Sequence, residues 1–426
     1  MPPPSDATRY RWTLAYLLLV VTTHAFATRF SMSVVAQQIQ SEAGLTNAQV
    51  GSTLSAFIIG YAVMQFPVGI LVDRLGAFRL LTASVFGWSL FTLASAALIW
   101  LPSSLWVTGL FITRLLSGAC QASVLTATIK MLGRWMPAGE RSSANGLSLM
   151  GLGLGGALSP PLVVWMIGLG GWAVPFWVFG ASGLLVAAVL AKSGREWPGE
   201  HPLVNSAELA LIRDGATAEP AKTAGPTPWR LLFWSVSVWG LILSYGIAAY
   251  TSYVFFTWFY LYLVNVRGMT KTAGGYWAGL PYVAVSIGTV AGGRLSDWLT
   301  LRYGKRTGRL LVVLAGEGLA ALLIVLGGRI DNVTLAIPLL ALAAGLHLFG
   351  QTSSWAAAVD IAPQHAGALF GLMNTVAQVT GAIAPIATPF IALHFGWTSA
   401  LDFSAGLVTL AGLLWLVVRP DRPVTR

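Results

Sequence analysis

The sequence predicts an all-α membrane protein in which twelve transmembrane helices form two pseudo-symmetric six-helix bundles. Three observations lead to this prediction. Of the 426 residues, 56% are hydrophobic and 9% are charged, whereas about a quarter of a soluble domain is charged. Apolar runs of about 20 residues, the length that crosses a bilayer, recur along the whole chain. A charged turn in the first half also returns in the second half.

The duplicated turn reads GILVDRLGAFR from Gly69 and GRLSDWLTLRYGKR from Gly293, and each copy lies between two apolar runs. Asp73 in the first copy corresponds to Asp297 in the second. A glycine-rich run that ends in proline repeats at nearly the same spacing. These repeats indicate that two similar membrane halves were joined. We expect an N-terminal bundle at 1–191, a cytoplasmic linker at 192–230 and a C-terminal bundle at 231–426.

The twelve predicted helices follow the apolar runs. They lie at 12–36, 49–72, 80–101, 105–129, 143–167, 172–191, 231–264, 273–296, 309–328, 333–359, 366–393 and 397–418. Most of the 25 Lys and Arg residues then fall on one side of the membrane, and basic residues gather on the cytoplasmic side. We therefore expect a multi-pass protein of the bacterial inner membrane with both termini in the cytoplasm. The net charge of +10 reflects this topology, and we expect the lipid bilayer as a partner and no nucleic acid.

Polar residues mark the ends and faces of the first-half helices. Thr46 or Asn47 is placed to cap the second helix. Tyr61 lies inside that helix. Arg114 and Gln121 are two helical turns apart and so share one face of the fourth helix. This face is a candidate lining for a polar site.

The linker and the second half carry further polar patterns. In the linker, SAELALI predicts a short surface helix capped by Ser206. Three sets of residues each share one helix face: Tyr250, Tyr253 and Thr257; His347, Gln351 and Trp355; and Asn374 and Gln378. We include Tyr253, His347, Gln351 and Asn374 among the candidate substrate-binding residues.

Two arginines lie inside predicted spans, Arg29 in the first and Arg114 in the fourth. An arginine at membrane depth costs roughly 2.5–3.5 kcal/mol on insertion scales, and it usually faces a bundle interior or a water-filled cavity. The first four spans contain no acidic residue except Asp73, at the far edge. A guanidinium in such a place suits the paired oxygens of an anion. The alternative is a structural clamp between helices.

Three ionisable groups inside spans are candidates for carrying a proton. These are His24 in the first span, Glu317 in the ninth and His347 in the tenth. His24 is five residues before Arg29, about 140° around the helix, and so is not expected on the Arg29 face. For Glu317 the alternative is a hydrogen bond that packs two helices together.

The duplicated turns suggest a conformational latch on the cytoplasmic side. An Asp at such a turn can accept backbone hydrogen bonds from a neighbouring helix and pair with Arg. The candidate latch residues are Gly69, Asp73, Arg74, Gly76, Arg79, Asp297 and Arg302. The alternative is that these charges only fix the topology.

The sequence shows no hydrolase elbow, P-loop, metal cluster or dinucleotide fingerprint. GLGLGG in the fifth span matches a loose glycine pattern, but no strand precedes it. We expect neither an enzyme nor a cofactor, and no metal.

The turn GILVDRLGAFR, the twelve spans and the long central loop resemble the major facilitator superfamily. Within it, further stretches resemble the anion:cation symporter family of sugar-acid and organic-anion transporters: LSAFIIGYAVMQFPVGILVDRLG, RLLSGACQA, GERSSANGL, EWPGEHPLVNSAEL, GGRLSDW and VDIAPQHAGALFGLMNT. The resemblance covers nearly the whole chain. It implies two six-helix bundles that alternate access to a site near the midplane.

The resemblance also implies roles for single residues. Arg29 and Tyr61 would bind the substrate anion, Arg114 would support the polar core, and Asn374 would contact the substrate from the other half. Where the family usually has an Asp before the first-helix Arg, this chain has Thr28. Where the family usually has a Glu after the fourth-helix Arg, this chain has Gln121.

Neither Thr nor Gln takes up a proton, so coupling through those two family positions is excluded. We expect a secondary active transporter, a monomer, that moves a small carboxylate, sugar acid or sulfonate. Coupling through His347 or Glu317, anion exchange and facilitated diffusion stay open. A drug or metabolite exporter and a non-transporting anion sensor are the remaining alternatives.

Overall fold

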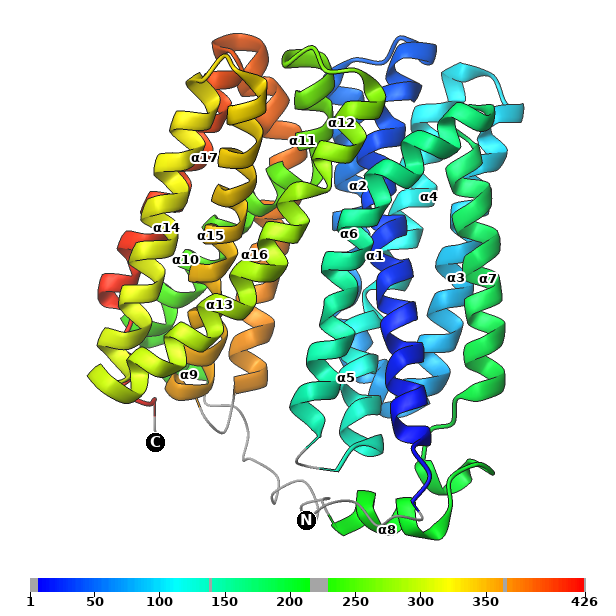
Figure 1. Cartoon of the computed structure of the whole chain (residues 1–426), viewed down its shortest axis with the longest axis vertical. Coiled ribbons are helices and arrows are strands. Elements are labelled where there is room, and N and C mark those ends of the chain that lie inside the picture. The colour runs from blue at the N-terminus through cyan, green and yellow to red at the C-terminus, as the bar shows by residue number, and fades with distance from the viewer. Residues whose placement is uncertain (1–6, 138–139, 215–228, 363–365, 425–426) are drawn as a thin grey trace. The chain divides into compact units, whose positions relative to one another are not determined.

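The computed structural model describes residues 7–137, 140–214, 229–362 and 366–424, and helices form the regular structure of these residues (Figure 1). In the first part of the chain the helices are α1 (Tyr10–Ala43), α2 (Asn47–Leu75), α3 (Ala77–Ala97), α4 (Trp106–Gln121), α5 (Ser123–Trp135), α6 (Arg141–Gly170), α7 (Val174–Ser193) and α8 (Ser206–Asp214). The remaining α-helices are α9 (Trp229–Trp234), α10 (Val236–Thr257), α11 (Phe259–Leu261), α12 (Lys271–Ala278), α13 (Leu280–Tyr303), α14 (Lys305–Arg329), α15 (Val333–Ile361), α16 (Ala366–Phe395) and α17 (Trp397–Leu414).

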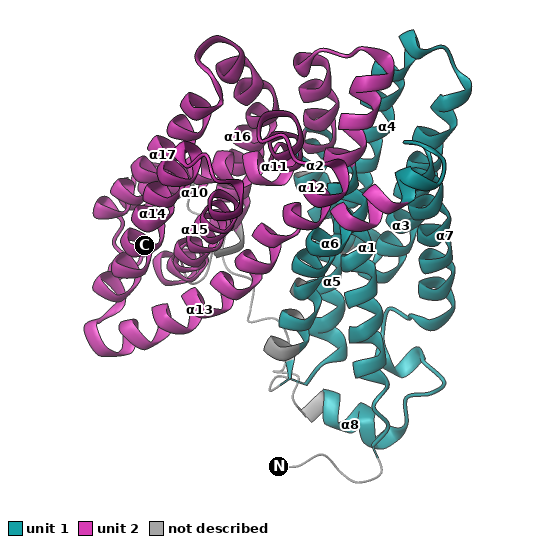
Figure 2. Ribbon diagram, turned by 45° about the horizontal axis from the view of Figure 1, so that its top comes forward, with its two compact units in different colours: residues 1–31, 59–159, 166–223 teal, residues 32–58, 160–165, 224–426 magenta. Residues whose placement is uncertain are grey.

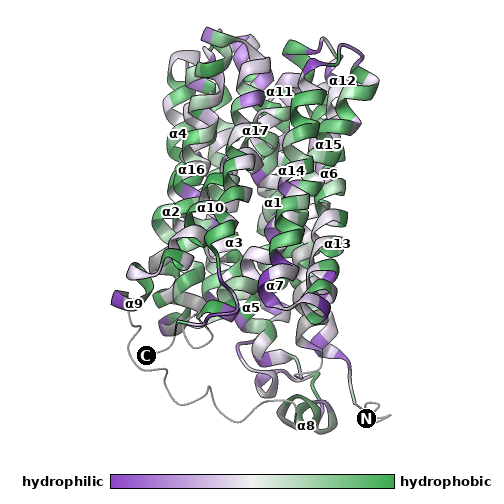
Figure 3. Cartoon of the chain, turned by 90° about the vertical axis from the view of Figure 1, so that its left-hand side faces the viewer, coloured by the Kyte–Doolittle hydropathy of each residue, from purple (hydrophilic) through white to green (hydrophobic). Residues whose placement is uncertain are grey.

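Ten helical segments of the described chain are long and apolar enough to cross a membrane. Hydrophobic residues cover most of the length of these helices (Figure 3). The second and eighth predicted spans correspond to α2 and α13, which are not among the ten. The all-helical membrane fold is therefore confirmed, and the number twelve stays a prediction.

Several predicted spans are interrupted. The fourth span divides at Ala122 into α4 and α5. The seventh continues past Trp258 into a π-helical turn at Tyr262–Val266. The eighth divides at Gly279, where α12 ends and α13 begins. Such interruptions depend on the packing around a helix, which an apolar run does not encode.

The duplicated charged turn is tighter than the sequence suggests. Most of GILVDRLGAFR belongs to α2 or α3, and Gly76 alone connects the two helices. In the second copy Gly304 connects α13 and α14 in the same way. Their φ angles are 89° and 83°, a region that other L-residues rarely adopt. The matching geometry supports the duplication predicted from the sequence.

Capping at two helix starts follows the sequence closely. The Thr46 hydroxyl accepts a hydrogen bond from the Gln49 amide (3.3 Å), and the Gln49 side chain accepts one from the Thr46 amide (2.9 Å). This reciprocal pair is a capping box at the start of α2, as predicted for Thr46. At α8 the cap is Asn205, which accepts from the Glu208 amide at 2.9 Å, and the predicted Ser206 is the first helical residue.

The chain folds into two compact units (Figure 2). Unit 1 comprises 1–31, 59–159 and 166–223, and unit 2 comprises 32–58, 160–165 and 224–426. The C-terminal part of α1 and the N-terminal part of α2 thus group with the second half of the chain. The predicted bundle and linker boundaries stay a prediction, and linker residues 215–228 lie outside the described chain.

Unit 2 contains close helix contacts between distant segments. A Cβ placed on Gly51 of α2 would lie 2.3 Å from the carbonyl oxygen of Pro385 in α16. One turn further along α2, the Ser55 hydroxyl donates to the Ala382 carbonyl at 2.8 Å. Small residues such as these let two helix backbones approach closely. The two contacts fasten the start of α2 to α16.

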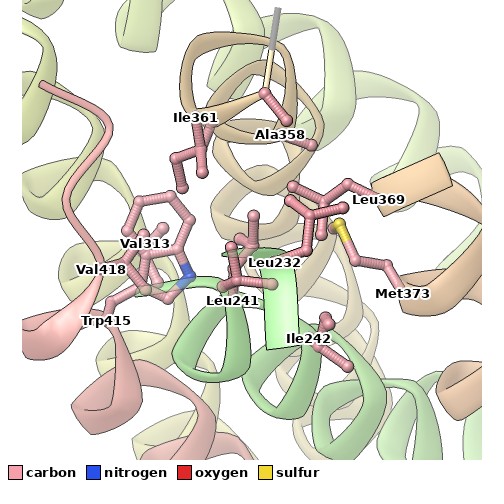
Figure 4. Packing of buried hydrophobic residues seen from close by; sticks show 13 residues of the cluster. Leu232, Leu241, Ile242, Val313, Ala358, Ile361, Leu369, Met373, Trp415 and Val418 are labelled. Carbon is pink, nitrogen blue, oxygen red and sulfur yellow. The ribbon is translucent and has the colours of Figure 1, made fainter. Parts of the chain in front are cut away.

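A buried hydrophobic cluster holds another part of unit 2 together (Figure 4). It gathers side chains from α9, α10, α14, α15 and α16, with Trp415 and Val418 from near the end of the chain. The Val424 amide also donates to the Ile361 carbonyl at 2.7 Å. These C-terminal residues are therefore packed into unit 2.

We predict that Gly51→Ala destabilises the protein, whereas Gly69→Ala on the same helix does not. The added methyl group would meet the Pro385 carbonyl at position 51, and it would meet nothing within 4 Å at position 69. Overpacking of this kind typically costs about 1–3 kcal/mol. Thermal unfolding in detergent should show a melting temperature several degrees lower for Gly51→Ala alone. Equal melting temperatures for the two variants would contradict the α2–α16 contact.

Candidate functional site

The first candidate site in unit 1 is the pair Arg29 of α1 and Tyr61 of α2. The guanidinium carbon of Arg29 lies 5.1 Å from the centroid of the Tyr61 ring, which is cation–π distance. Tyr61 is buried and Arg29 is half-buried. The aromatic ring therefore restricts where the guanidinium can point, while part of the arginine stays accessible.

Arg114 braces α1 beside this pair. Its side chain on α4 is buried, and its Nη2 atom donates to the Arg29 carbonyl at 3.0 Å. Its Nη1 atom donates to the Thr28 carbonyl at 3.4 Å. In this arrangement Arg114 positions the α1 backbone at Arg29. Its predicted contact with substrate stays a prediction.

The surroundings of the two arginines are rich in positive charge. Between residues 7 and 195 the acidic residues are Glu42, Asp73 and Glu140. Each of these three lies at or next to a helix end, whereas Arg29 and Arg114 lie within helices. Charges at membrane depth are screened weakly. The interior of unit 1 therefore favours an anionic ligand.

The two positions that lack the expected acids are both buried. The Thr28 hydroxyl donates to the His24 carbonyl at 2.8 Å and so bonds within its own helix. Among the described residues, Gln121 keeps a buried Nε2 donor for which no acceptor is present. An amide with an unused donor suits an acceptor oxygen of a ligand. Gln121 thus stays a candidate ligand.

His24 lies in a different environment from Arg29. Its Nε2 atom is 2.9 Å from the Phe179 carbonyl and 3.2 Å from the Ser182 hydroxyl, both on α7. Its ring stacks on Trp88 of α3, with 6.3 Å between the ring centroids. These contacts pack α1 against α7 and α3, and they offer a structural reason for a histidine at this position.

Unit 2 contains a buried hydrogen-bond network around Glu317 of α14. Its Oε2 atom lies 2.7 Å from His347 Nδ1 on α15. Its Oε1 atom accepts a hydrogen bond from the side-chain Nε2 of Gln351. The other ring nitrogen of His347 lies 2.9 Å from the hydroxyl of Ser252 on α10. Glu317 and His347 are fully buried, and Ser252 is half-buried. The structure therefore joins two of the predicted proton-site residues, Glu317 and His347.

A second polar chain in unit 2 joins α10 to α16. The Tyr253 hydroxyl donates to Gln378 Oε1 at 2.7 Å, and Gln378 Nε2 donates to Asn374 Oδ1 at 3.4 Å. A Cβ on Gly381 would meet the Tyr253 ring at 2.3 Å, so this glycine makes room for the ring. Asn374 is half-buried. Its contact with substrate, and that of Tyr253, stay predictions.

The turn between α2 and α3 of unit 1 is organised by Glu196, which sequence reasoning did not single out. The Glu196 carboxylate accepts from the backbone amides of Ala77 (2.9 Å) and Phe78 (2.8 Å), the first residues of α3. It also forms an ion pair with Arg134 of α5. A carboxylate at a helix N-terminus is favoured by the helix dipole and its open amides. Glu196 thus makes contacts of the kind predicted for Asp73. The side chain of Asp73 lies outside the described part of the structure, so its role stays a prediction.

A second linker carboxylate, Glu208 of α8, caps the start of α1. It is fully buried and accepts from the Thr8 hydroxyl (2.6 Å), the Arg11 amide (3.0 Å) and Arg11 Nη1 (3.0 Å). Arg11 also pairs with Glu140 at 2.7 Å. The predicted surface helix α8 is therefore docked against unit 1. Both capping carboxylates, Glu196 and Glu208, belong to the polar stretch EWPGEHPLVNSAEL. This stretch is the feature of the sequence from which they could have been found.

The second copy of the turn has a different arrangement. Arg302 lies over the rings of Trp298 and Tyr303 at 5.6 and 5.8 Å, and Asp297 is exposed. The acid that forms ion pairs near this turn is Asp360 of α15, which lies 2.8 Å from Lys305 Nζ. The latch function of the two turns, including Gly69, Arg74 and Arg79, stays a prediction.

Comparison with known proteins places these sites in context. Residues 17–385 match the family model described as Major Facilitator Superfamily. The chain is 30% identical to the "probable galactarate/D-glucarate transporter" of Bacillus subtilis, across 98% of this chain and 93% of the relative. It is also 30% identical to the "probable sulfoacetate transporter" of Cupriavidus necator, across 93% of this chain and 91% of the relative.

A solved structure with the same fold is the bacterial homologue of the human lysosomal transporter Spinster. The two chains superpose with a TM-score of 0.79 at 19% sequence identity, across 97% of this chain and 98% of the other. At this identity the likeness concerns the fold alone.

We predict that acidification loosens residues 197–214 from the start of α1 in two steps, because Arg11 pairs with both Glu140 and Glu208. Burial lowers the pKa of His201 below its ordinary 6.5, so the neutral ring contributes stability that is lost as the pH falls below about 6.5. The hydrogen bond from Arg11 lowers the pKa of Glu140 below 4.5. The stability from that carboxylate is therefore present above about pH 4.5 and is lost at more acidic pH.

Hydrogen exchange of residues 197–214, corrected for intrinsic rates, would measure both steps. His201→Phe is the matched control because it can keep the stacking on the Tyr10 ring, whose centroid is 3.9 Å from that of His201. This variant should lose the first step and keep the second. An unchanged first step in His201→Phe would contradict the assignment.

Proposed function

The chain belongs to the Major Facilitator Superfamily, and we propose that it carries a small organic dianion across the cytoplasmic membrane by alternating access. Its relatives are transporters, and the chain is not an enzyme. The family resemblance predicted from the charged turn is thereby confirmed. We further propose a bacterial inner-membrane location, cytoplasmic termini, a monomeric state and two halves joined by the cytoplasmic linker.

The proposed substrate class follows from the chemistry shared by the substrates named for these two relatives. Galactarate and D-glucarate each carry two carboxylates, and sulfoacetate carries one carboxylate and one sulfonate. These relatives are equally similar to the chain. Two acidic groups on a short carbon skeleton are therefore the common feature, and hydroxyl groups on that skeleton are not.

The observation that carries the proposal is the geometry of Arg29. Its guanidinium lies over the Tyr61 ring, and its own backbone carbonyl is fixed by Arg114. A planar guanidinium held in this way can donate two parallel hydrogen bonds to one carboxylate or sulfonate. The second guanidinium nearby adds positive potential, and the acidic residues between residues 7 and 195 lie at or next to helix ends. We propose Arg29 and Tyr61 as anion ligands and Arg114 as the residue that positions them.

We propose that transport is coupled to a proton on the Glu317–His347 pair. With one proton shared between them, the pair is neutral overall, because a carboxylate faces an imidazolium or a carboxylic acid faces an imidazole. Loss of that proton leaves an isolated negative charge in a fully buried place, which is costly. A change of conformation that wets the pair would therefore favour proton release. The half-buried hydroxyl of Ser252 is the polar group through which the pair would exchange its proton.

The helices α14, α15 and α17 carry few other charged side chains. The other charged residues of α14, α15 and α17 within the described chain are Lys305, Arg306, Arg309, Arg329, Asp360 and Asp402, and those of α14 and α15 lie at or near helix ends. Asp402 pairs with Arg329 at 2.7 Å on an exposed surface. Helix α10 contains no Asp, Glu, His, Lys or Arg. Glu317 and His347 therefore lie in the middle of α14 and α15, away from the charged residues at the ends of those two helices.

We predict that Arg29→Ala lowers uptake of the dianion at least about 100-fold. Each charge-assisted hydrogen bond contributes about 1.5–3 kcal/mol, and a bidentate contact loses two. The measurement is counterflow in proteoliposomes with galactarate, D-glucarate and sulfoacetate as trial substrates. The matched control is Arg329→Ala, which removes an exposed ion pair and should leave uptake within about twofold.

The amount of each variant in the membrane is measured alongside, because a loss of protein would mimic a loss of function. Tyr61→Leu, which removes the ring under Arg29, should reduce uptake by about tenfold, between the contributions of an exposed and a desolvated cation–π contact. Normal counterflow by Arg29→Ala would contradict the proposal that Arg29 binds the substrate anion. Ligand binding without any flux would favour a sensor, and accumulation in inverted vesicles would favour an exporter.

We predict that Glu317→Gln abolishes accumulation driven by a pH gradient and keeps counterflow exchange. The amide can retain hydrogen bonds of the network but cannot bind or release a proton. Asp402→Asn, a change of the same kind at the exposed pair, should keep both activities. Uptake that ignores a pH gradient in the unmodified protein would instead support anion exchange or facilitated diffusion.

A further inference from the structure

A hollow lined by arginines lies at the linker end of α3. The cavity has a volume of about 380 Å³, and Arg74, Arg79, Arg134 and Arg195 contribute to its walls. Glu196 and Glu200 are the acidic residues of the lining. Four positive and two negative charges leave this cavity with a net positive charge. Neither the anion site nor the proton site uses it.

Two of the four arginines already have structural partners. Arg134 pairs with Glu196 and lies 4.3 Å from the centroid of the Trp197 ring. Arg195 donates to the Gly194 carbonyl at 2.6 Å. These contacts hold both side chains in the lining of the cavity. Arg74 and Arg79, which also line it, are exposed and so are accessible to a ligand.

An apolar groove of about 570 Å³ adjoins this cavity and shares Phe78 and Arg79 with it. The groove runs between α3 and α7, which pack side by side (Figure 1). One wall includes Phe86, and the other consists of small side chains such as Ala188 and Ala191. Ala188, Ala191 and Phe86 are exposed. The groove therefore opens on the flank of two membrane helices.

We propose that the cavity and the groove together bind one anionic phospholipid of the cytoplasmic leaflet. The headgroup phosphate would lie among the arginines, and an acyl chain would lie along the groove. Basic pockets beside membrane helices on the cytoplasmic side favour anionic headgroups. Trp197, which is 50% exposed beside the cavity, suits the headgroup level, where tryptophan is enriched.

The continuity of the two hollows is what selects a lipid over a soluble anion. A free phosphate would use the arginines and leave the groove empty. A lipid fills both, because its charged and apolar parts are joined in the order in which the two surfaces follow each other. The bound headgroup would also touch the carboxyl-bearing segment that caps α3, so that lipid, linker and α3 share one contact region.

Native mass spectrometry of the full chain in detergent would test this site. The probes are phosphatidylglycerol, the zwitterionic lipid phosphatidylcholine and inorganic phosphate. We expect phosphatidylglycerol to bind at least about tenfold more tightly than phosphatidylcholine, and Arg74→Gln/Arg79→Gln to lose roughly tenfold in affinity for phosphatidylglycerol, since each basic residue near the surface contributes a severalfold factor.

A second variant tests the groove separately. Ala188→Phe fills it and should weaken phosphatidylglycerol binding without altering the charges. The matched controls are Arg302→Gln/Arg306→Gln in the second copy of the turn and Ala315→Phe on an exposed face of α14, and both should bind as the unmodified protein does. Unchanged binding by the arginine or groove variants would overturn the proposal. Competition by inorganic phosphate at equal affinity would also overturn it, because it would identify a soluble-anion site.

Discussion

The structure depends on how a fixed positive charge is kept inside a membrane helix. Arg29 needs polar surroundings because insertion of a guanidinium at that depth is costly. The chain supplies them with an aromatic ring from α2 and with a second arginine from α4 that holds the α1 backbone. The second arginine adds another positive charge beside the first. Under the proposed function, an anionic substrate binds at this pair of charges.

The two units divide the ionisable chemistry between them. Unit 1 holds the two arginines and keeps its acids at helix ends, whereas unit 2 holds a buried carboxylate with its histidine. Where the anion:cation symporter family usually has two acidic residues, this chain has Thr28 and Gln121. Neither side chain can take up a proton. A buried carboxylate in the other unit supplies a titratable group in their place. Under the proposed function, binding and coupling belong to different parts of the chain.

The sequence predicted features that depend on local chemistry or on duplication. These include the long helices, a cap at Thr46 and the duplication of the charged turn. Contacts between segments that are distant in the sequence could not be predicted. That Glu196 caps α3, or that Gly51 approaches Pro385, depends on where a loop or a neighbouring helix comes to lie, and no periodicity records it. The hydrogen bond that joins the Glu317 and His347 candidates was missed for the same reason.

The docking of α8 has a practical consequence for watching this molecule work. Glu208 and Arg11 tie the helix to the start of α1, so α8 moves with unit 1 although it lies in the linker. A fluorophore attached at the exposed Ala210 would therefore report on α8 together with the start of α1. Paired with a second dye on α14, it would measure changes in the distance between these two helices.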